Sequence, residues 1–436
     1  SNFTEWLVNT VAKKSGNGDL IAYFFRRAFE LLAANGTIGL IGAKAISEGD
    51  SLRVGIEPLY ASGVRFYRVD RNRKWPSKNV GTNISIVWAS FGEVDCPAVL
   101  DGELVSGISQ LLLSDDGGLI RPEALARTKL AFTGVYFHGD GFLINGEEAA
   151  ELISKNPAER SVIRPFLNAI DLNSRVNRIG PNWIIDFGAL SKIDAKKHTG
   201  SWGLVERLVK PEREKLDPQK YKWRRENWWR FASSSEELKQ KLRLVNFAIA
   251  IPVTSKLMIP ARVNSHQVFS SALAICPIES TSFYALVSSW LHRSWAEWWG
   301  SKMRDDFRYT VSGCFDTFPF CGQSAELEKH GKDLDLLQRE IANNRNIGLT
   351  KIYNMVNAGD CGDLDIKQLR ELHEKIDREV VRAFQFNIEL GGYECSEFRG
   401  LMQWGPPANQ RTEILQLLLA ENQRQQNEGV IEWPTK

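Results

Sequence analysis

An amphipathic helix pattern, followed at once by strand-like runs, most constrains the fold of this chain. The stretch GDLIAYFFRRAFELLAANG (18–36) places its apolar residues on one face at 3.6 residues per turn. Asp19 can cap the start of this helix, and Gly36 can end it. The runs that follow are TIGLIGAKAI (37–46), GVRFYRVDRNRKWP (63–76) and NISIVWASF (83–91). This order predicts the second half of an α/β sheet, without a first half before it.

Tryptophan is concentrated in the middle of the chain, where nine of the fourteen tryptophans fall between residues 183 and 299. Strand-like runs alternate with turns in the same part: NWIIDFG (182–188), NFAIAIPV (246–253) and SALAICPI (271–278). STSFYALVSSWLHRSWAEWWG (280–300) has apolar residues near helical spacing. We therefore predict a mixed α/β domain with an aromatic core over residues 161–320.

Helical patterns dominate the remainder of the chain. The amphipathic stretches are AELEKHGKDLDLLQREIANNR (325–345), DIKQLRELHEKIDREVVRAF (365–384) and RTEILQLLLAENQRQQ (411–426). Before the aromatic domain, GFLINGEEAAELISKNP (141–157) is typical of a strand that enters a short helix. The predicted division is 1–115, a connector over 116–160, the domain over 161–320 and a helical domain over 321–436.

Cysteine spacing, hydropathy and net charge exclude several classes of protein. The six cysteines show no C-x-x-C pair and no regular spacing, so we expect neither a disulfide framework nor a zinc site. No apolar run is long enough to span a bilayer, and the N-terminus has no signal-peptide pattern. We expect a cytoplasmic protein with no membrane partner. Because the net charge is only +2, a polyanion must meet a local basic patch.

Short motifs for nucleotide or metal sites are weak in this sequence. The G-x-G pairs at 16–18 and 139–141 do not join a strand to a helix, so we interpret them as turns. The six histidines are not spaced as metal ligands or as a catalytic triad. Glu237 and Lys239 match the E-x-K half of a nuclease metal site, and we interpret this match as chance. We predict no metal site.

The basic stretch from Val205 to Arg230 holds nine Lys or Arg against five acids, which gives a net charge of +4. Its second half, KYKWRRENWWRF (220–231), sets aromatic rings beside arginines. Arginine presents a planar fork to phosphate and stacks on rings, which suits a nucleic-acid backbone. The alternative is a solvated helix face whose tryptophans point into the core. Composition leaves both interpretations open.

Three long segments follow one another in a distinctive order and spacing: VIRPFLNAIDLNSRVNRIGPNWIIDFG (162–188), ERLVKPEREKLDPQKYKWRRENWWRFA (206–232) and GSKMRDDFRYTVSGCFDTFPF (300–320). They resemble the target-recognition domain of MmeI-like and related single-chain restriction-modification or phage-defence DNA methyltransferases. Residues 22–90 are similar to the last part of that family's catalytic domain. NIGLTKIYN (346–354) and LRELHEKIDREVVRAF (369–384) look like its C-terminal helical segment. The resemblance covers nearly the whole chain.

The resemblance implies a fold of the α/β and α+β classes. Residues 1–115 would form the C-terminal half of a Rossmann-like class I methyltransferase sheet. Residues 161–320 would form a mixed α/β DNA target-recognition domain, joined to the sheet by the connector over 116–160. Residues 321–436 would form the helical tail.

Enzymes of this family transfer a methyl group from S-adenosylmethionine to the exocyclic amine of adenine. They use a Gly-rich cofactor loop and an Asn/Asp-Pro-Pro-aromatic motif, and neither occurs here. The one Pro-Pro, Pro406–Pro407, is preceded by Gly405 and followed by Ala408. In the family both motifs precede the part that matches Asp19 onward. We therefore expect the catalytic N-terminal half to be missing, either by truncation or as a separate polypeptide. This chain alone should then be inactive and should not bind S-adenosylmethionine.

The resemblance also indicates which residues would contact a flipped adenine and the bases that are read. Trp75 and Pro76 take the place where an aromatic ring borders the flipped base, and the cations Arg73, Lys74 and Lys78 favour an exposed cleft there. A core role is the alternative for Trp75. In the family, base-reading positions lie in the part that matches residues 250–270. The candidates are Thr254, Ser255, Lys256, Arg262, Asn264 and His266, with Lys256 and Thr254 alternating on one face of a strand.

Phosphate contacts are predicted for six cationic side chains. These are Lys210, Arg213, Arg224, Arg225, Arg304 and Arg308. For Arg304 and Arg308 the alternative is internal pairing with Asp305 and Asp306. We expect Trp228 and Trp229 to be mainly core residues that anchor the helix carrying Arg224 and Arg225.

The sequence thus predicts specific binding of double-stranded DNA for adenine methylation, in a restriction-modification or phage-defence system. One alternative is a non-catalytic specificity subunit that recruits a separate methyltransferase or nuclease chain. Another is a protein-interaction scaffold whose basic surface only keeps it soluble. The scaffold predicts no binding to duplex DNA even at low salt.

Overall fold

The computed structural model divides the chain into two compact units. The first unit comprises 1–125, 295–319 and 412–429, and the second comprises 126–294, 320–411 and 430–436. The structure describes residues 2–11, 18–33, 36–43, 46, 49–76, 83–92, 96–114, 122–127, 129–303, 306–398 and 401–433. The division into four domains stays a prediction, because the boundaries of compact units and of functional domains need not coincide.

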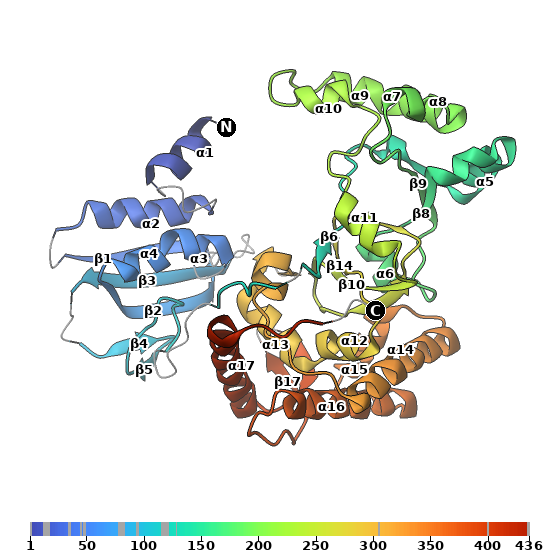
Figure 1. The fold of residues 1–436 in the computed structure, drawn as a ribbon. Helices are drawn as coiled ribbons and strands as arrows, with labels where there is room; N and C mark the ends of the chain where they lie inside the picture. Colours follow the sequence, from blue (N-terminus) through green and yellow to red (C-terminus); the bar gives the residue numbers. More distant parts are fainter. Residues whose placement is uncertain are drawn as a thin grey trace. The chain divides into compact units, whose positions relative to one another are not determined.

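A five-stranded mixed sheet forms the scaffold of the first unit, with strand order β1-β3-β2-β4-β5. β3 pairs antiparallel with both β1 and β2, and β2 pairs parallel with β4. Helices α2 and α4 pack against this sheet (Figure 1). The elements are α2 Leu20–Glu30, β1 Thr37–Ala43, α3 Gly49–Gly55, α4 Glu57–Ala61, β2 Val64–Lys74, β3 Asn83–Phe91, β4 Ala98–Leu100 and β5 Glu103–Val105. The three predicted strands of this region are confirmed.

Helix α2 begins where the sequence predicts, since the Asp19 Oδ1 accepts the Ile21 N–H at 3.1 Å. Its predicted end at Gly36 is wrong, because the helix ends at Glu30 and its C-cap Leu31 is 70% exposed instead of extending the buried face. Phe25 is fully buried. Its neighbour Phe24 is 65% exposed. Neighbouring residues on a helix point about 100° apart, so only one of the two can face the core.

The first unit is completed by the N-terminal helices, by an internal segment within 295–319 and by a C-terminal helix. They are α1 Asn2–Trp6, the π-helix η1 Leu7–Val11, the hairpin strands β15 Ser301–Met303 and β16 Asp306–Arg308, the π-helix η6 Val311–Phe315 and most of α17 Ala408–Glu428. Asn422 on α17 donates to the carbonyls of Glu123 at 3.1 Å and Thr317 at 2.6 Å. One amide therefore joins three segments that are remote in sequence.

Two four-stranded sheets organise the second unit, with orders β12-β10-β14-β6 and β13-β8-β9-β7. The strands are β6 Phe132–Thr133, β7 Leu143–Asn145, β8 Ile163–Leu167, β9 Asn182–Ile185, β10 Phe247–Pro252, β12 Ala261–Asn264, β13 Val268–Phe269 and β14 Leu273–Cys276. β10 lies between β12 and β14 and is buried from Ala248 to Pro252. The strand predictions at 182–188, 246–253 and 271–278 are confirmed.

Short helices attach to these sheets largely as predicted. Strand β7 enters α5 (Gly146–Lys155) through a capping box, in which Asn145 and Glu148 each bond the other's backbone N–H. The helical pattern over 280–300 becomes two helices, α12 (Thr281–Ser288) and α13 (Trp290–Trp299). They are separate because Ser289 is extended, with φ −68° and ψ 155°.

Long helices make up most of the rest of the second unit. They are α14 Ala325–Arg345, α15 Leu349–Val356 and α16 Leu364–Ala383, followed by the hairpin β17 Glu394–Phe398 and β18 Leu401–Gly405. The three amphipathic stretches predicted after residue 321 are confirmed as α14, α16 and α17. Among the described helices, none is both long and apolar enough to cross a bilayer.

A buried chain of polar side chains runs through the second unit into these helices. The Arg178 Nη1 lies 3.0 Å from the Asp335 Oδ1, and its Nη2 donates to the Gln338 Oε1 at 2.9 Å. The Gln338 Nε2 donates to the Tyr353 hydroxyl at 2.8 Å, and that hydroxyl lies 2.7 Å from the His373 Nε2. Because Tyr353 accepts from Gln338, it can donate to a neutral His373.

The acid stability of the second unit should depend on His373. Burial, with a smaller effect from the charge of Arg293, lowers the pKa of His373 from 6.5 to about 4. The lower folded pKa means that this stability is present above pH 6.5 and is lost as the pH falls toward 4, by about 3 kcal/mol. Urea denaturation at several pH values should show the loss. His373→Gln keeps an acceptor for Tyr353 but does not titrate, so it should reduce the pH dependence by that amount, and an unchanged dependence would contradict the assignment.

Candidate nucleic-acid interface

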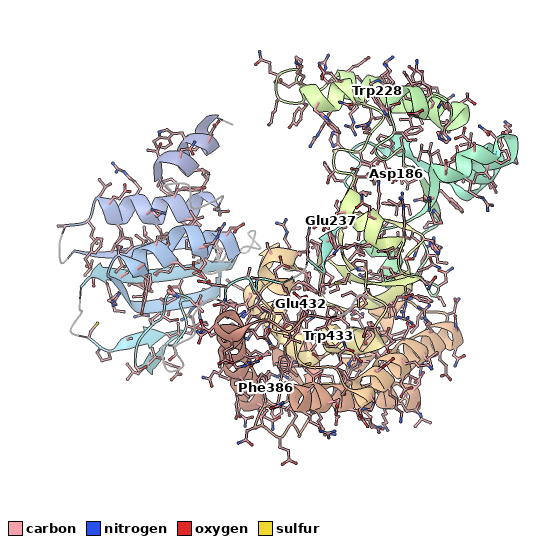
Figure 2. The ribbon with its side chains drawn as sticks, in the orientation of Figure 1. Asp186, Trp228, Glu237, Phe386, Glu432 and Trp433 are labelled. Carbon is pink, nitrogen blue, oxygen red and sulfur yellow. The ribbon has the colours of Figure 1, made fainter. Side chains whose placement is uncertain are left out.

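The basic stretch folds into short helices laid over an aromatic core. The helices are α8 Thr199–Leu208, α9 Lys210–Glu214 and α10 Lys222–Glu226. Trp202, Trp228 and Trp229 are buried and pack on one another, with ring centroids between 4.8 and 6.0 Å apart. Figure 2 shows Trp228 within this helical layer. The prediction that Trp228 and Trp229 are mainly core residues is confirmed.

Two arginines of the layer keep uncompensated charge near the surface. The Arg224 guanidinium lies 5.1 Å from the centroid of the Tyr221 ring, and the Arg225 Nη1 donates to the Leu216 carbonyl at 2.8 Å. Both side chains are half-buried. Within the described part of the chain, neither has a carboxylate partner at ion-pair distance. Both therefore remain candidates for DNA phosphates.

Lys210 is more constrained than these arginines. Its Nζ lies 3.4 Å from the Glu206 Oε1 and 5.6 Å from the centroid of the Trp228 ring. Glu206 also accepts the indole N–H of Trp202 at 3.0 Å. A phosphate contact by Lys210 would compete with Glu206, and this role stays a prediction.

Arg213 does not fit the predicted phosphate role, and the structure corrects it. Its side chain is only 1% exposed, and its Nη2 donates to the carbonyls of Phe137 and His138. Burial, with the nearby charge of Arg224, lowers the pKa of the Arg213 guanidinium to about 10. A guanidinium without access to solvent cannot reach a DNA backbone. Arg213 instead ties helix α9 to the loop before the 3-10 helix η4 (Asp140–Phe142).

Trp223 is exposed, which the sequence analysis did not predict. It is 49% exposed on α10, whereas Trp228 and Trp229 are buried. In the chain it lies between the cations Lys222 and Arg224, and this local pattern could have indicated its exposure. An exposed ring flanked by cations can stack on a base or a sugar.

The base-reading candidates at 254–256 lie on a shorter strand than predicted. Strand β11 contains only Thr254 and Ser255, both half-buried. The prediction that Lys256 alternates with Thr254 on a strand face is wrong, because β11 ends at Ser255 and the chain bends at 256 and 257, where the Ser255 hydroxyl donates to the Leu257 carbonyl at 2.7 Å. Lys256 is exposed just beyond the strand. Their role in base reading stays a prediction.

The remaining base-reading candidates differ in how free their side chains are. The Arg262 Nη1 lies 3.6 Å from the Asp335 Oδ2, and its guanidinium lies 4.3 Å from the centroid of the Phe247 ring. Arg262 would have to leave these partners to bind guanine. The Asn264 Oδ1 accepts the His266 N–H at 2.7 Å, and both residues are exposed.

The candidates of the first unit lie at strand ends. Trp75 and Pro76 follow β2 directly, and Trp75 is 41% exposed. This exposure removes the core alternative for Trp75 but does not establish contact with a base. Arg308 is exposed at the end of β16. Arg304 lies outside the described residues, as do Lys78 and Asp305.

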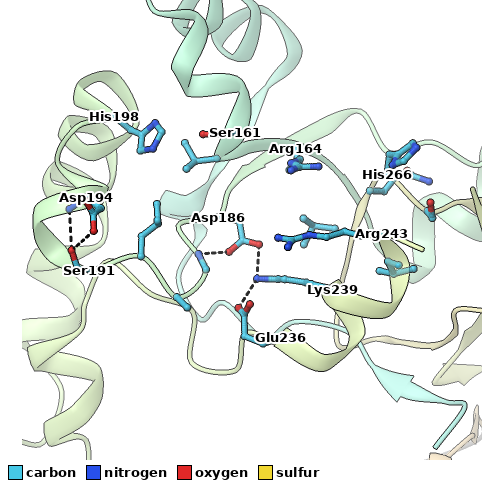
Figure 3. Close-up of a pocket in the computed structure, with 18 residues that line it drawn as sticks. Ser161, Arg164, Asp186, Ser191, Asp194, His198, Glu236, Lys239, Arg243 and His266 are labelled. Atoms are coloured by element: carbon cyan, nitrogen blue, oxygen red, sulfur yellow. Dashed lines mark hydrogen bonds and ion pairs between the residues drawn. The ribbon is translucent and has the colours of Figure 1, made fainter. Parts of the chain in front are cut away.

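An open hollow in the second unit, of about 780 Å³, was not expected from the sequence. Strand β8, the segments that follow β9 and β12, and helix α11 (Glu236–Leu242) line it (Figure 3). On one side the Lys239 Nζ pairs with the Asp186 Oδ2 at 2.7 Å and with the Glu236 Oε1 at 3.2 Å. Glu237 points elsewhere and pairs with Lys129 at 3.2 Å. Among the described residues, no group of three acidic, histidine or cysteine side chains could hold a metal ion.

Comparison with known proteins points to one family. Residues 123–322 match the model of the family described as "MmeI, target recognition domain". The chain is 22% identical over 405 residues to DNA methyltransferase A of Bacillus subtilis (strain 168), which covers 85% of this chain and 42% of that protein. It is similar in fold to the Type IIL restriction-modification enzyme MmeI, solved in complex with DNA, with a TM-score of 0.71 and 17% identity over 97% of this chain and 55% of the other. The chain thus spans about half the length of the proteins that it matches.

Proposed function

We propose that this chain, whose residues 123–322 match the MmeI target recognition domain, binds double-stranded DNA and reads its sequence for a DNA methyltransferase. The observation that carries the proposal is the family match, which spans both four-stranded sheets of the second unit and the cationic layer of α8 to α10. The fold of MmeI, solved with DNA bound, supports DNA as the partner.

We further propose that the methylated atom is the exocyclic amine of adenine and that S-adenosylmethionine is the donor in the complete enzyme. Both follow from the resemblance of residues 22–90 to the end of the family's catalytic domain. On this proposal the sheet of the first unit is part of a Rossmann-like methyltransferase sheet. Trp75, exposed after β2, would stack on the flipped base, which must leave the duplex before it can react.

A non-catalytic specificity subunit is the second candidate. In such a subunit the recognition domain would bind DNA, and a separate chain would transfer the methyl group. Transfer of labelled methyl groups from S-adenosylmethionine to duplex DNA separates the two. Transfer by this chain without a partner would exclude the specificity subunit, whereas transfer that requires an added catalytic chain would support it.

The salt dependence of DNA affinity tests the proposed interface. We expect the reversal Arg224→Glu with Arg225→Glu to reduce the slope of log K against log salt by about one to two units, because each phosphate contact contributes about 0.9. Fluorescence anisotropy with a labelled duplex measures this slope. The pair Arg224→Lys with Arg225→Lys keeps both charges and should keep the slope.

The matched control reverses two exposed lysines of the C-terminal helices, Lys332→Glu and Lys351→Glu. This control changes the net charge by the same amount and should leave the slope unchanged. Equal losses in both double variants would mean that only overall charge matters, and the interface would then be placed wrongly.

A further inference from the structure

The open hollow beside α11 is lined by both acidic and basic side chains. Its lysine is already engaged, because Lys239 is held between Asp186 and Glu236. Asp186 also accepts the Gly188 N–H at 2.9 Å. Lys239 thus offsets one of these two carboxylates, and the third acid of the lining, Asp194, pairs with Lys197 at 2.7 Å.

Two arginines on the lining are not neutralised in this way. Arg164 projects from β8, and Arg243 follows the last turn of α11. Figure 3 draws both among the side chains that line the hollow, and both residues are exposed. In the ranges that the structure describes, neither has a carboxylate at ion-pair distance. Two guanidinium groups on one hollow repel each other unless an anion lies near both.

A buried acceptor adds a second requirement on the ligand. Gln267 lines the same hollow and is only 7% exposed. Its Nε2 donates to the Asn264 carbonyl at 3.2 Å, but its Oε1 has no hydrogen-bond partner in the structure. A buried carbonyl oxygen without a donor is costly, so a ligand that brings an N–H or O–H would be favoured.

We propose that the hollow receives one nucleotide of a DNA strand, with its phosphodiester held by Arg164 and Arg243. Arginine forks match phosphate oxygens two at a time. A volume of about 780 Å³ far exceeds one phosphate, and so leaves room for the sugar and the base, whose amine or ring N–H can donate to the Gln267 Oε1. This inference rests on the proposed function, since it assigns a further contact to the same DNA.

The test removes both charges from the hollow in the full chain. With Arg164→Ala and Arg243→Ala, the salt slope for a labelled duplex should fall by about one unit, because the one phosphate held by both arginines loses its partners. Arg164→Lys with Arg243→Lys should keep the slope but weaken binding, since a lysine cannot form the two-pronged contact. The control Lys332→Ala with Lys351→Ala removes the same charge outside the hollow and should change nothing.

Each other outcome decides against the inference. If the wild-type chain binds the duplex and the double arginine variant shows the same salt slope, the hollow does not contact DNA. The proposed function would still stand. Binding of free dAMP is measured for the same variant. If the double arginine variant bound the duplex as the wild-type chain does but no longer bound free dAMP, the hollow would be a site for free nucleotides, and its assignment to a DNA strand would be overturned. Absence of duplex binding by the wild-type chain would overturn the proposed function and this inference with it.

Discussion

Trp228→Ala is expected to lower the free energy of opening of the second unit by about 3 to 5 kcal/mol. The ring is 4% exposed and lies 4.8 Å from the ring of Trp202 and 5.9 Å from that of Trp229, centroid to centroid. Truncation removes the buried apolar surface and leaves a cavity that two rigid indoles cannot easily fill. Trp228→Phe should cost less, because it retains part of the ring volume.

Native-state hydrogen exchange of the β9 amides (Asn182–Ile185) measures this loss locally, so it does not require the whole chain to unfold in one step. Trp223→Ala is the matched control. It removes the same side chain from an exposed position five residues earlier, and its effect on stability should stay within about 0.5 kcal/mol. Similar losses at both positions would show that Trp228 is not the anchor of the layer.

Arg178→Ala should destabilise the second unit by about 3 kcal/mol. The side chain is 2% exposed, and it bonds Asp335, Gln338 and the Arg262 carbonyl. Removing it leaves buried acceptors without a donor. The loss should lie at the low end of the range for buried ion pairs, because Asp335 keeps its contact with Arg339 at 3.0 Å.

The control for this change is Arg175→Ala in the same loop. Arg175 pairs with Asp171 at 3.1 Å, but its side chain is 45% exposed, so its loss should cost less than about 1 kcal/mol. Hydrogen exchange of amides in α14 reports both variants. If Arg178→Ala proved as mild as Arg175→Ala, the buried chain of polar residues would not hold α14 against the sheets.

Local patterns accounted for much of the fold. Helix α2, its Asp19 cap, the strands β1 to β3 and the long C-terminal helices follow from periodicity and capping within the segment itself. The errors at helix ends and at β11 are of the same local kind. Helix α2 stops at Glu30, before the apolar residues of its pattern do, and strand β11 is only two residues long.

The site was less predictable, because burial is set by contacts between segments that are remote in sequence. Arg213 and Arg224 are alike in the sequence, but Arg213 is buried by carbonyls 75 and 76 positions earlier. Arg178 was not singled out, since its partner Asp335 lies 157 positions away. The hollow is likewise lined by residues of both β8 and α11. Neither segment carries a motif that predicts a shared site.

The central claim, that the chain reads the sequence of duplex DNA, is tested most directly by selection from a random pool. Immobilised wild-type chain would be mixed with random-sequence duplexes at moderate salt, and the retained DNA sequenced after repeated rounds. We predict that a single short consensus emerges. Retention without any enriched sequence, or no retention even at low salt, would contradict the claim.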